Sequence, residues 1–306
     1  RRSRSLVRLQ QEQATYFVER AYPTSLVPAR DVGVAVHGDL LDGKVGYSVG
    51  LFNGVVDGAA AGDVDFDDSK EFTAQLYVRP FSSKFDFANP RLVSGLFIGV
   101  AATRGEKTGT AANTYLPTYR TTGQNAFFSY TTDTSATAPA GSTAVAAGVQ
   151  NRLTGHIYAP VGPVAVLGEY IIDQQRVARG TISKLITSQA WNITAAVALT
   201  GEDARFESIS PAHPLDLTKG HFGAVELAAR FSGMIIDRDA FNSVAQDTRS
   251  ARLASEFGGG VNWYATRNFR VTGDYFVTEF RSGAAASLGG RRDLEQVFLI
   301  RNQVAF

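Results

Sequence analysis

The C-terminal segment 295–306 alternates apolar and polar side chains with a period of two residues. An apolar stripe on one face and an Arg/Gln stripe on the other is the pattern of a strand between lipid and a water-filled lumen. The apolar face carries Phe298, Ile300, Val304 and Phe306, the polar face carries Arg301 and Gln303, and Gln296 falls in the apolar register where the strand begins. This segment therefore predicts a chain built from membrane-spanning strands.

Composition alone does not separate a membrane barrel from a soluble protein. The chain has 306 residues, of which 44% are hydrophobic, but no run approaches the ~20 apolar residues that a spanning helix needs. The net charge of +1 gives no support for nucleic-acid binding. The absence of cysteine excludes disulfides and thiolate metal sites, and it suits an oxidising compartment.

Alternation and turn residues predict eleven strands. They lie near residues 32–40, 43–53, 70–80, 91–103, 150–159, 163–178, 186–200, 222–234, 253–265, 268–280 and 294–306. The tight connections are 41–43, 160–162 and 266–268, and the long ones include 54–69, 104–149, 235–252 and 281–293.

Membrane barrels place short turns at one rim and long loops at the other. Counting strands back from residue 306 puts all three tight turns at one rim. The connection 201–220 is the exception, because the count places this long segment at the rim of the tight turns. An additional strand at 125–130 would break the agreement, so we expect 104–149 to be a loop.

Three further strands have two distinct faces. In the strand near 222–234, one face carries Val225, Leu227, Ala229 and Phe231, and the other carries Glu226, Arg230 and Ser232. In the strand near 70–80, one face carries Phe72, Ala74, Leu76 and Val78, and the other carries Thr73, Gln75, Tyr77 and Arg79. In the strand near 186–200, one face carries Trp191, Ile193, Ala195, Val197 and Leu199, and the other carries Asn192, Thr194 and Thr200. A soluble sandwich gives the same alternation. The aromatic residues Trp263, Tyr264 and Phe269 favour a membrane barrel, because aromatic girdles lie at membrane interfaces.

An odd strand number conflicts with a closed single-chain barrel, which has an even number in bacteria. An open edge in hydrocarbon leaves N–H and C=O groups unpaired, at several kcal/mol each. We therefore expect strands before Arg1 or strands from another chain; ~80–120 further residues would supply five strands with their turns. No signal peptide is visible at Arg1–Arg4, since no apolar segment follows. The strand count brings residues 1–31 in from the rim of the long loops.

Several stretches, in order and spread over nearly the whole chain, point to a family. They are Phe17–Ala21 with Pro28–Gly33, His37–Asp39, Gly50–Gly54, Gly162–Pro163 with Gly168–Tyr170, Ala190–Trp191, Leu199–Asp203, Gly223–Phe231 and Val261–Tyr264. In these stretches the chain resembles the phosphate-selective porin O and P family of outer-membrane channels. A last strand that ends on an aromatic residue, here Phe306, also resembles the C-terminal assembly signal of Gram-negative outer-membrane barrels.

The resemblance implies an all-β fold, a transmembrane antiparallel β-barrel of about sixteen strands. About the last eleven would be present here, in a homotrimer in the bacterial outer membrane. Residues 1–31 would form a constriction loop that folds inward, and 32–306 the C-terminal part of a single barrel domain. The implied function is passive diffusion of small hydrophilic solutes, chiefly anions such as phosphate. The partners are then outer-membrane lipid and the anions themselves, with no cofactor and no catalysed reaction.

The expected constriction carries charges of both signs. Arg20 and Arg30 would attract anions there, and Glu19 and Asp31 would partly oppose them. With the neighbouring Arg4, Arg8 and Glu12, four cations stand against three carboxylates. This mixed surface is not a strong anion trap.

Five further charges fall on the polar face of predicted strands, namely Arg79, Glu169, Glu226, Arg230 and Arg301. An Arg or Lys pointed at lipid at mid-depth costs about 2–4 kcal/mol, so we expect these side chains to face water. One interpretation is that they solvate the wall and pair across strands. The other is that they set the electric field that a permeating ion experiences.

The sequence leaves two other functions open. The segment 46–50 matches G-x-S-x-G, the nucleophile elbow of hydrolases, which needs a sharp strand-to-helix turn. It lies inside an alternating strand, so a rim hydrolase with Ser48 as nucleophile is the weaker hypothesis. The other alternative is a structural barrel whose long loops bind a surface partner.

Metal binding has little support in the sequence. The segment 63–68 begins like a Ca²⁺ loop but lacks the Gly and Glu that such a loop requires. The histidines are His37, His156, His213 and His221. They show no zinc-binding spacing, so we expect no metal site, and we expect His37 to face the lumen beside Asp39.

Overall fold

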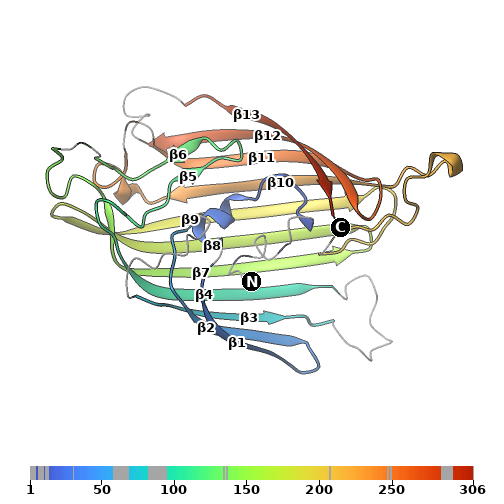
Figure 1. Cartoon of the computed structure of the whole chain (residues 1–306), viewed down its shortest axis with the longest axis horizontal. Coiled ribbons are helices and arrows are strands. Elements are labelled where there is room, and N and C mark those ends of the chain that lie inside the picture. The colour runs from blue at the N-terminus through green and yellow to red at the C-terminus, as the bar shows by residue number, and fades with distance from the viewer. Residues whose placement is uncertain are drawn as a thin grey trace.

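The computed structural model describes residues 5, 10, 14–29, 31–57, 69–81, 95–133, 135, 137–206, 208–246, 248, 250–283 and 292–305. Eleven strands of this part form one antiparallel sheet, in which each strand pairs with the next one along the chain (Figure 1). They are β1 (Gly33–Leu40), β2 (Val45–Phe52), β3 (Glu71–Val78), β4 (Phe97–Thr108), β7 (Val145–Val161), β8 (Val164–Arg179), β9 (Ile182–Ala198), β10 (Ala224–Ile236), β11 (Ala251–Tyr264), β12 (Phe269–Gly283) and β13 (Glu295–Val304). The predicted number and order of strands are confirmed.

Two short strands lie outside this sheet. β5 (Tyr119–Arg120) pairs with β6 (Ala126–Phe128), within the segment that we expected to be a loop. That expectation was wrong in detail. Because β5 and β6 form a separate two-stranded sheet, they add no strand to the wall and leave the strand count unchanged. Short 3-10 turns are η2 (Tyr22–Leu26), η4 (Leu217–Lys219) and η5 (Arg238–Ala240).

Some strand boundaries differ from those predicted. β4 begins at Phe97 and continues to Thr108, whereas the sequence suggested 91–103; residues 91–94 lie outside the described part. β7 runs through Val161, so the tight turn is at 162–163, where Gly162 has a φ of 56°. Glycine adopts such a φ at no steric cost, so Gly162 suits the reversal of the chain at this point.

The three predicted tight turns lie at the same end of the sheet. The β1–β2, β7–β8 and β11–β12 turns lie at the end where β13 finishes, as the strand count predicts (Figure 1). The long β9–β10 connection projects from the same end. One tight turn was missed: β8 and β9 are joined through Gly180, with a φ of 59°, at the opposite end.

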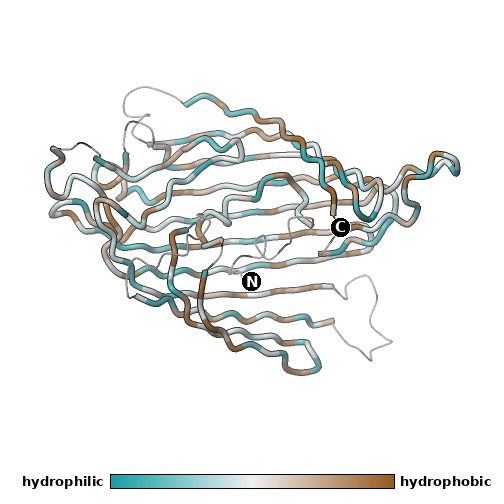
Figure 2. The backbone as a smooth tube through the Cα atoms, viewed as in Figure 1, coloured by the Kyte–Doolittle hydropathy of each residue, from teal (hydrophilic) through white to brown (hydrophobic). Residues whose placement is uncertain are grey.

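The two faces of the sheet have opposite chemistry, as the alternating colours along the strands in Figure 2 show. On β13 the side chains of Phe298, Ile300 and Val304 are 62–65% exposed. On the other face of the sheet, Arg152, Arg230 and many other polar side chains are buried. These are Glu169, Asp173, Glu226, Glu256, Asn262, Arg270, Thr272, Asp274 and Thr278, each at most 4% exposed.

This arrangement is the reverse of a soluble protein, which buries its apolar side chains and rarely buries charges. A soluble sandwich would pack the stripes of Phe257, Phe298 and Ile300 against a second sheet. Here these side chains remain on the outside of the sheet. The outward face therefore matches lipid, and the inward face matches a polar interior. Among the described residues, no helix is long and apolar enough to cross a membrane.

The outward face changes from apolar to polar along the strands. On β4 the outward positions pass from Ile98 and Val100 to Arg104. Elsewhere on the outward face, tyrosines bond to glutamines of neighbouring strands. The Tyr170 hydroxyl donates to Gln189 Oε1 at 2.5 Å, and the Tyr275 hydroxyl donates to Gln296 Oε1 at 2.9 Å. Such amphipathic aromatic residues are typical of the edge of the hydrocarbon layer.

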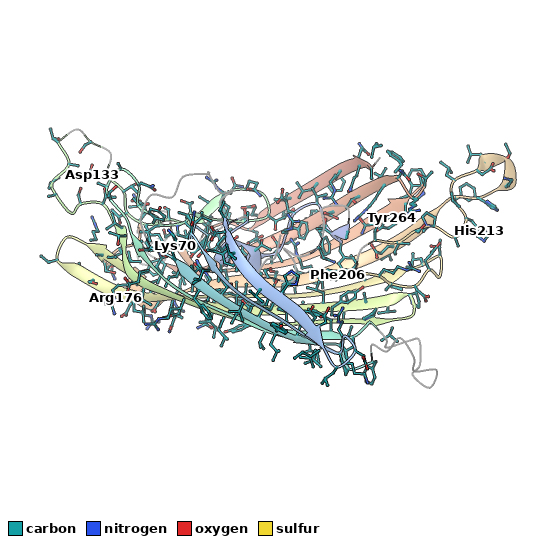
Figure 3. The ribbon with its side chains drawn as sticks, turned by 60° about the horizontal axis from the view of Figure 1, so that its bottom comes forward. Lys70, Asp133, Arg176, Phe206, His213 and Tyr264 are labelled. Carbon is teal, nitrogen blue, oxygen red and sulfur yellow. The ribbon has the colours of Figure 1, made fainter. Side chains whose placement is uncertain are left out.

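One residue of the expected aromatic girdle faces the other way. Tyr264 is 4% exposed and points inward, where its hydroxyl donates to Glu226 Oε2 at 3.1 Å (Figure 3). Its neighbour Trp263 does point outward, and its indole N–H donates to the carbonyl oxygen of Phe222 at 2.7 Å. The strand pleat places adjacent residues on opposite faces, so only one of the two can reach the interface.

Residues 14–29 lie against the inward face of the sheet. Tyr22, Leu26 and Val27 pack on inward apolar side chains of β8, β9 and β10. Those partners include Ile171, Val177, Ile186, Ala190, Met234 and Ile236. The inward face therefore has an apolar patch beneath Tyr22, Leu26 and Val27, within a face that also carries many polar side chains.

Candidate functional site

The wall holds the backbone of the inner segment 14–22 through polar side chains. On β11 and β12, inward side chains supply donors and acceptors to consecutive peptide groups. Arg270 Nη2 donates to the Thr15 carbonyl at 2.6 Å, Asn262 Nδ2 to the Tyr16 carbonyl at 2.9 Å, and the Val18 amide to Asp274 Oδ2 at 2.6 Å. A segment without regular secondary structure thereby satisfies buried backbone groups that would otherwise cost free energy. The inner segment is thus fixed to the wall.

Arg230 on β10 contacts this segment through both a hydrogen bond and an aromatic ring. Its guanidinium donates to the Glu19 carbonyl at 2.7 Å and to Glu256 Oε1 at 2.7 Å. It also lies over the rings of Phe17 and Phe276, at 4.8 and 4.3 Å from their centroids. A planar guanidinium suits this combination of ion pairing and stacking, whereas an ammonium does not. Arg230 is 3% exposed, so its charge depends on Glu256 for compensation.

A cavity of about 480 Å³ opens beside the inner segment. Its lining includes Glu19, Arg20 and Tyr22 of the inner segment, and Asp57, Arg120 and Thr122 from other parts of the chain. Burial raises the pKa of Glu19, and the guanidiniums of Arg230, Arg20 and Arg301 oppose that rise. Arg20 also donates to the Gln10 carbonyl at 3.2 Å. Cationic and anionic side chains thus face the same polar space.

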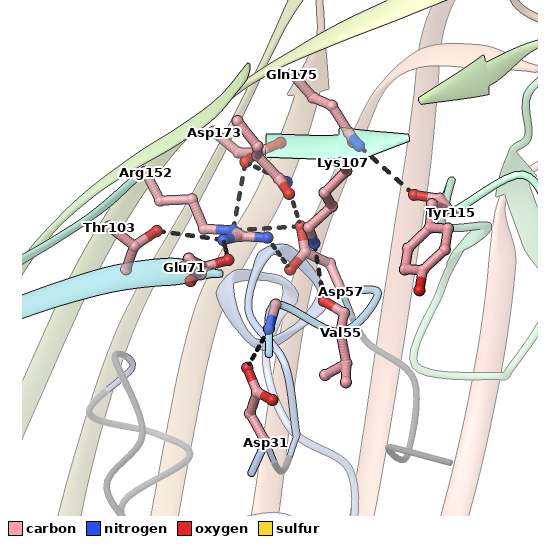
Figure 4. Close-up of polar contacts among 12 residues, drawn as sticks. Asp31, Val55, Asp57, Glu71, Thr103, Lys107, Tyr115, Arg152, Asp173 and Gln175 are labelled. Carbon is pink, nitrogen blue, oxygen red and sulfur yellow. Dashed lines mark hydrogen bonds and ion pairs between the residues drawn. The ribbon is translucent and has the colours of Figure 1, made fainter. Parts of the chain in front are cut away.

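A second polar cluster ties the start of the β2–β3 connection to the wall (Figure 4). Arg152 on β7 pairs with Asp57 at 2.5 Å, Glu71 at 2.8 Å and Asp173 at 3.4 Å. Gln150 Nε2 donates to Asp57 Oδ2 and to Asp173 Oδ1, both at 2.8 Å. All of these side chains are at most 3% exposed. Because Asp57 lies outside the strands, the cluster draws residues 53–57 onto the inward face.

Lys107 completes this cluster on β4. Its ammonium group donates to the Val55 carbonyl at 2.8 Å, and the residue is 2% exposed. The cluster therefore combines two cations with three carboxylates and binds the β2–β3 connection through both a side chain and a backbone carbonyl. Such dense pairing is expected of charges that are removed from water.

The predicted site residues fall into several places. Glu19 and Arg20 lie together at the cavity. Asp31 is apart from them, where its Oδ2 accepts from the Gly54 amide at 2.9 Å beside the end of β2. Arg30 and Phe306 lie outside the described residues, as do Arg4, Arg8, Glu12 and the segment 63–68.

The five predicted wall charges all lie at inward positions of a strand or, for Arg79, just beyond the end of one. Their contacts differ. Glu169 Oε2 accepts from the Ser5 hydroxyl at 2.9 Å, and Arg301 donates to the Thr15 hydroxyl at 3.1 Å. Glu226 accepts from Asn262 Nδ2 at 2.9 Å. Arg79 lies beyond the end of β3, where it pairs with Asp39 at 3.0 Å; the two side chains are 36% and 51% exposed.

The Arg152 cluster was not predicted from the sequence, although the sequence indicates the inward positions of some of its members. Arg152 and Asp173 occupy inward positions of predicted strands, as period-two counting would show. Asp57 and Lys107 were harder to find, because one lies in a connection and the other in a part of β4 that was assigned to a loop. The catalytic alternative also has no structural support. Ser48 lies inside β2 opposite His37 of β1, and the described residues that follow this strand, 53–57, are not helical.

The inward polar face, the outward apolar face and the inner segment together define an outer-membrane pore-forming protein. The family model of the phosphate-selective porin O and P family matches residues 3–306. The chain belongs to this family. It is accordingly a porin of the outer membrane and not an enzyme. No curated protein matches the chain.

Proposed function

We propose that the eleven strands are the last of about sixteen in a closed barrel, and that the barrel assembles as a homotrimer. The support is the open strand order, in which β1 and β13 are the two edges of the sheet. Edges in hydrocarbon leave peptide groups unpaired at several kcal/mol each, so further strands must join them. Residues 32–306 then form the C-terminal part of a single barrel domain.

The proposed function is passive diffusion of small hydrophilic solutes, with preference for anions such as phosphate. The observation that carries it is the inner segment, whose charged residues Glu19 and Arg20 border a polar cavity on the inward face. In this proposal residues 1–31 narrow the lumen. Arg20 and Arg30 attract anions, and Glu19 and Asp31 reduce that attraction.

The wall charges contribute mainly by holding this constriction. Arg230 and Arg301 contact the inner segment, and Glu226 bonds to Asn262, which binds it. Glu169 contacts Ser5, which lies in the same expected constriction, residues 1–31. Their influence on a permeating ion is then partly indirect, through the position of the segment. Arg79 stands nearer the rim and acts on ions at the mouth.

Reversal potentials in planar bilayers test the anion preference. With a salt gradient at neutral pH, we expect a potential of the sign that anion flow produces. A clear cation preference contradicts the proposal. A folded protein that inserts but carries no current favours instead a structural barrel whose loops bind a surface partner.

The raised pKa of Glu19 predicts a pH-dependent selectivity. As the pH falls from neutral toward the ordinary glutamate pKa of about 4.3, Glu19 takes up a proton before an ordinary glutamate does, because burial raises its pKa. The cavity then loses a negative charge, so the reversal potential should shift toward stronger anion preference. Glu19→Gln should show the stronger preference already at neutral pH and a flat response over this range. Glu106→Gln, on the outward side of β4, serves as the control and should keep the wild-type response.

A further inference from the structure

The β9–β10 connection, residues 199–223, brings two histidines together at the rim of the tight turns. His213 lies in the projecting loop that Figure 3 labels, and His221 lies close to the start of β10. Their ring centroids are 4.8 Å apart, and the ring planes make an angle of 40°. The two residues are separated by a short hairpin turn, which explains why sequence spacing alone did not indicate a pair.

Backbone hydrogen bonds fix the positions of both histidines. The Gly223 amide donates to the His213 carbonyl at 3.1 Å. Asp216 and His221 exchange backbone bonds, at 3.1 and 3.0 Å. The carboxylate of Glu202 accepts from the Ala212 amide at 3.2 Å, so it lies beside the residue before His213. The hairpin is therefore ordered by its own bonds, and an ion would not have to organise it.

The separation of the rings fits a shared metal ion. An ion about 2.0–2.1 Å from one nitrogen of each imidazole holds the ring centres roughly 4.5–5.2 Å apart, for nitrogen–metal–nitrogen angles of about 90–110°. The observed 4.8 Å lies within this range. No group of three His, Cys, Asp or Glu side chains in the described part of the chain is placed to hold a metal. Two imidazoles would therefore be the protein ligands, and water would supply the others.

We propose that His213 and His221 form a binding site for a divalent transition metal at this rim. Imidazole ligands suit Cu²⁺, Ni²⁺ and Zn²⁺, and the general affinity order places Cu²⁺ first. The site is separate from the inner segment and does not depend on the solute that the pore conducts. Metal binding would then be the role of the long β9–β10 connection, which the tight turns at the same rim do not share.

Trp263 provides a reporter for this site. Its indole N–H donates to the carbonyl of Phe222, the residue after His221, so the ring lies close to the proposed ion. The sequence contains two tryptophans, and Trp191→Phe removes the other. Cu²⁺ titrated into detergent-solubilised Trp191→Phe protein should quench the fluorescence with a saturable curve. His213→Ala and His221→Ala in this background should each weaken Cu²⁺ binding at least roughly tenfold.

His37→Ala is the matched control, because His37 is an exposed histidine on β1 at a distance from the loop and should leave the curve unchanged. Electron paramagnetic resonance of the Cu²⁺ complex provides a second measurement, with couplings to imidazole nitrogen that disappear in the double variant. Saturable quenching that survives both His213→Ala and His221→Ala, or a spectrum without nitrogen couplings, overturns the proposal.

Discussion

Replacement of Arg152 by methionine is expected to lower the free energy of unfolding by about 3–5 kcal/mol. The substitution leaves Asp57, Glu71 and Asp173 buried together, with Lys107 as the remaining cation of the cluster. Carboxylates in that position must take up protons or move toward water. We therefore also expect residues 53–57 to leave the inward face. Urea-dependent unfolding from lipid vesicles measures the first effect, and limited proteolysis of the β2–β3 connection measures the second.

Arg104→Met is the matched control for this substitution. Arg104 is next to Thr103, which is the register partner of Arg152, but its side chain lies on the outward face. There its Nη1 donates a long hydrogen bond to Asn151 Oδ1, at 3.4 Å. Surface changes of this kind usually alter stability by less than about 0.5 kcal/mol. Equal losses for the two variants would mean that the buried cluster has no special role in stability.

The second large effect is expected for Arg230→Met. This change leaves the Glu256 carboxylate buried without its cation and removes the donor to the Glu19 carbonyl. A stability loss of about 3–5 kcal/mol should result from the buried charge. The inner segment should also become accessible to protease, and the single-channel conductance should rise, since the proposed constriction is no longer held at this point.

A double variant separates these two consequences. Arg230→Met with Glu256→Gln removes both charges, so most of the lost stability should return. The conductance should remain high, because the contact with Glu19 is still absent. Wild-type conductance in both variants would show that Arg230 does not position the constriction.

The strands of the wall could be predicted from the sequence because each has one face in lipid. On β13, alternation alone identified which side chains point outward, and the same holds for β3, β9 and β10. Period-two patterns report the faces of a sheet directly, since one register shift would turn every charge toward lipid. Tyr264 was predicted to lie in the outward aromatic girdle because it is aromatic. Its position in the pleat, next to the outward Trp263, indicates the inward face instead.

The interior could be predicted only in part. Inward positions such as Ile171, Ile186 and Met234 break the polar pattern because Tyr22 and Leu26 cover them, and that packing cannot be read from either segment alone. The Arg152 cluster has the same origin, since Asp57 reaches it from a connection far away along the chain. The small sheet of β5 and β6 was missed because two- and three-residue strands carry no periodic signal.

The central claim is that the outward face lies in lipid and the inward face borders water. The chain contains no cysteine, so a single engineered thiol reports on one position. Gln75 faces inward on β3 and the adjacent Leu76 faces outward, 47% exposed. In protein reconstituted into vesicles, we expect Gln75→Cys to react with a charged, water-soluble thiol reagent and Leu76→Cys to be protected from it. Rapid labelling of Leu76→Cys with protection of Gln75→Cys would contradict the account.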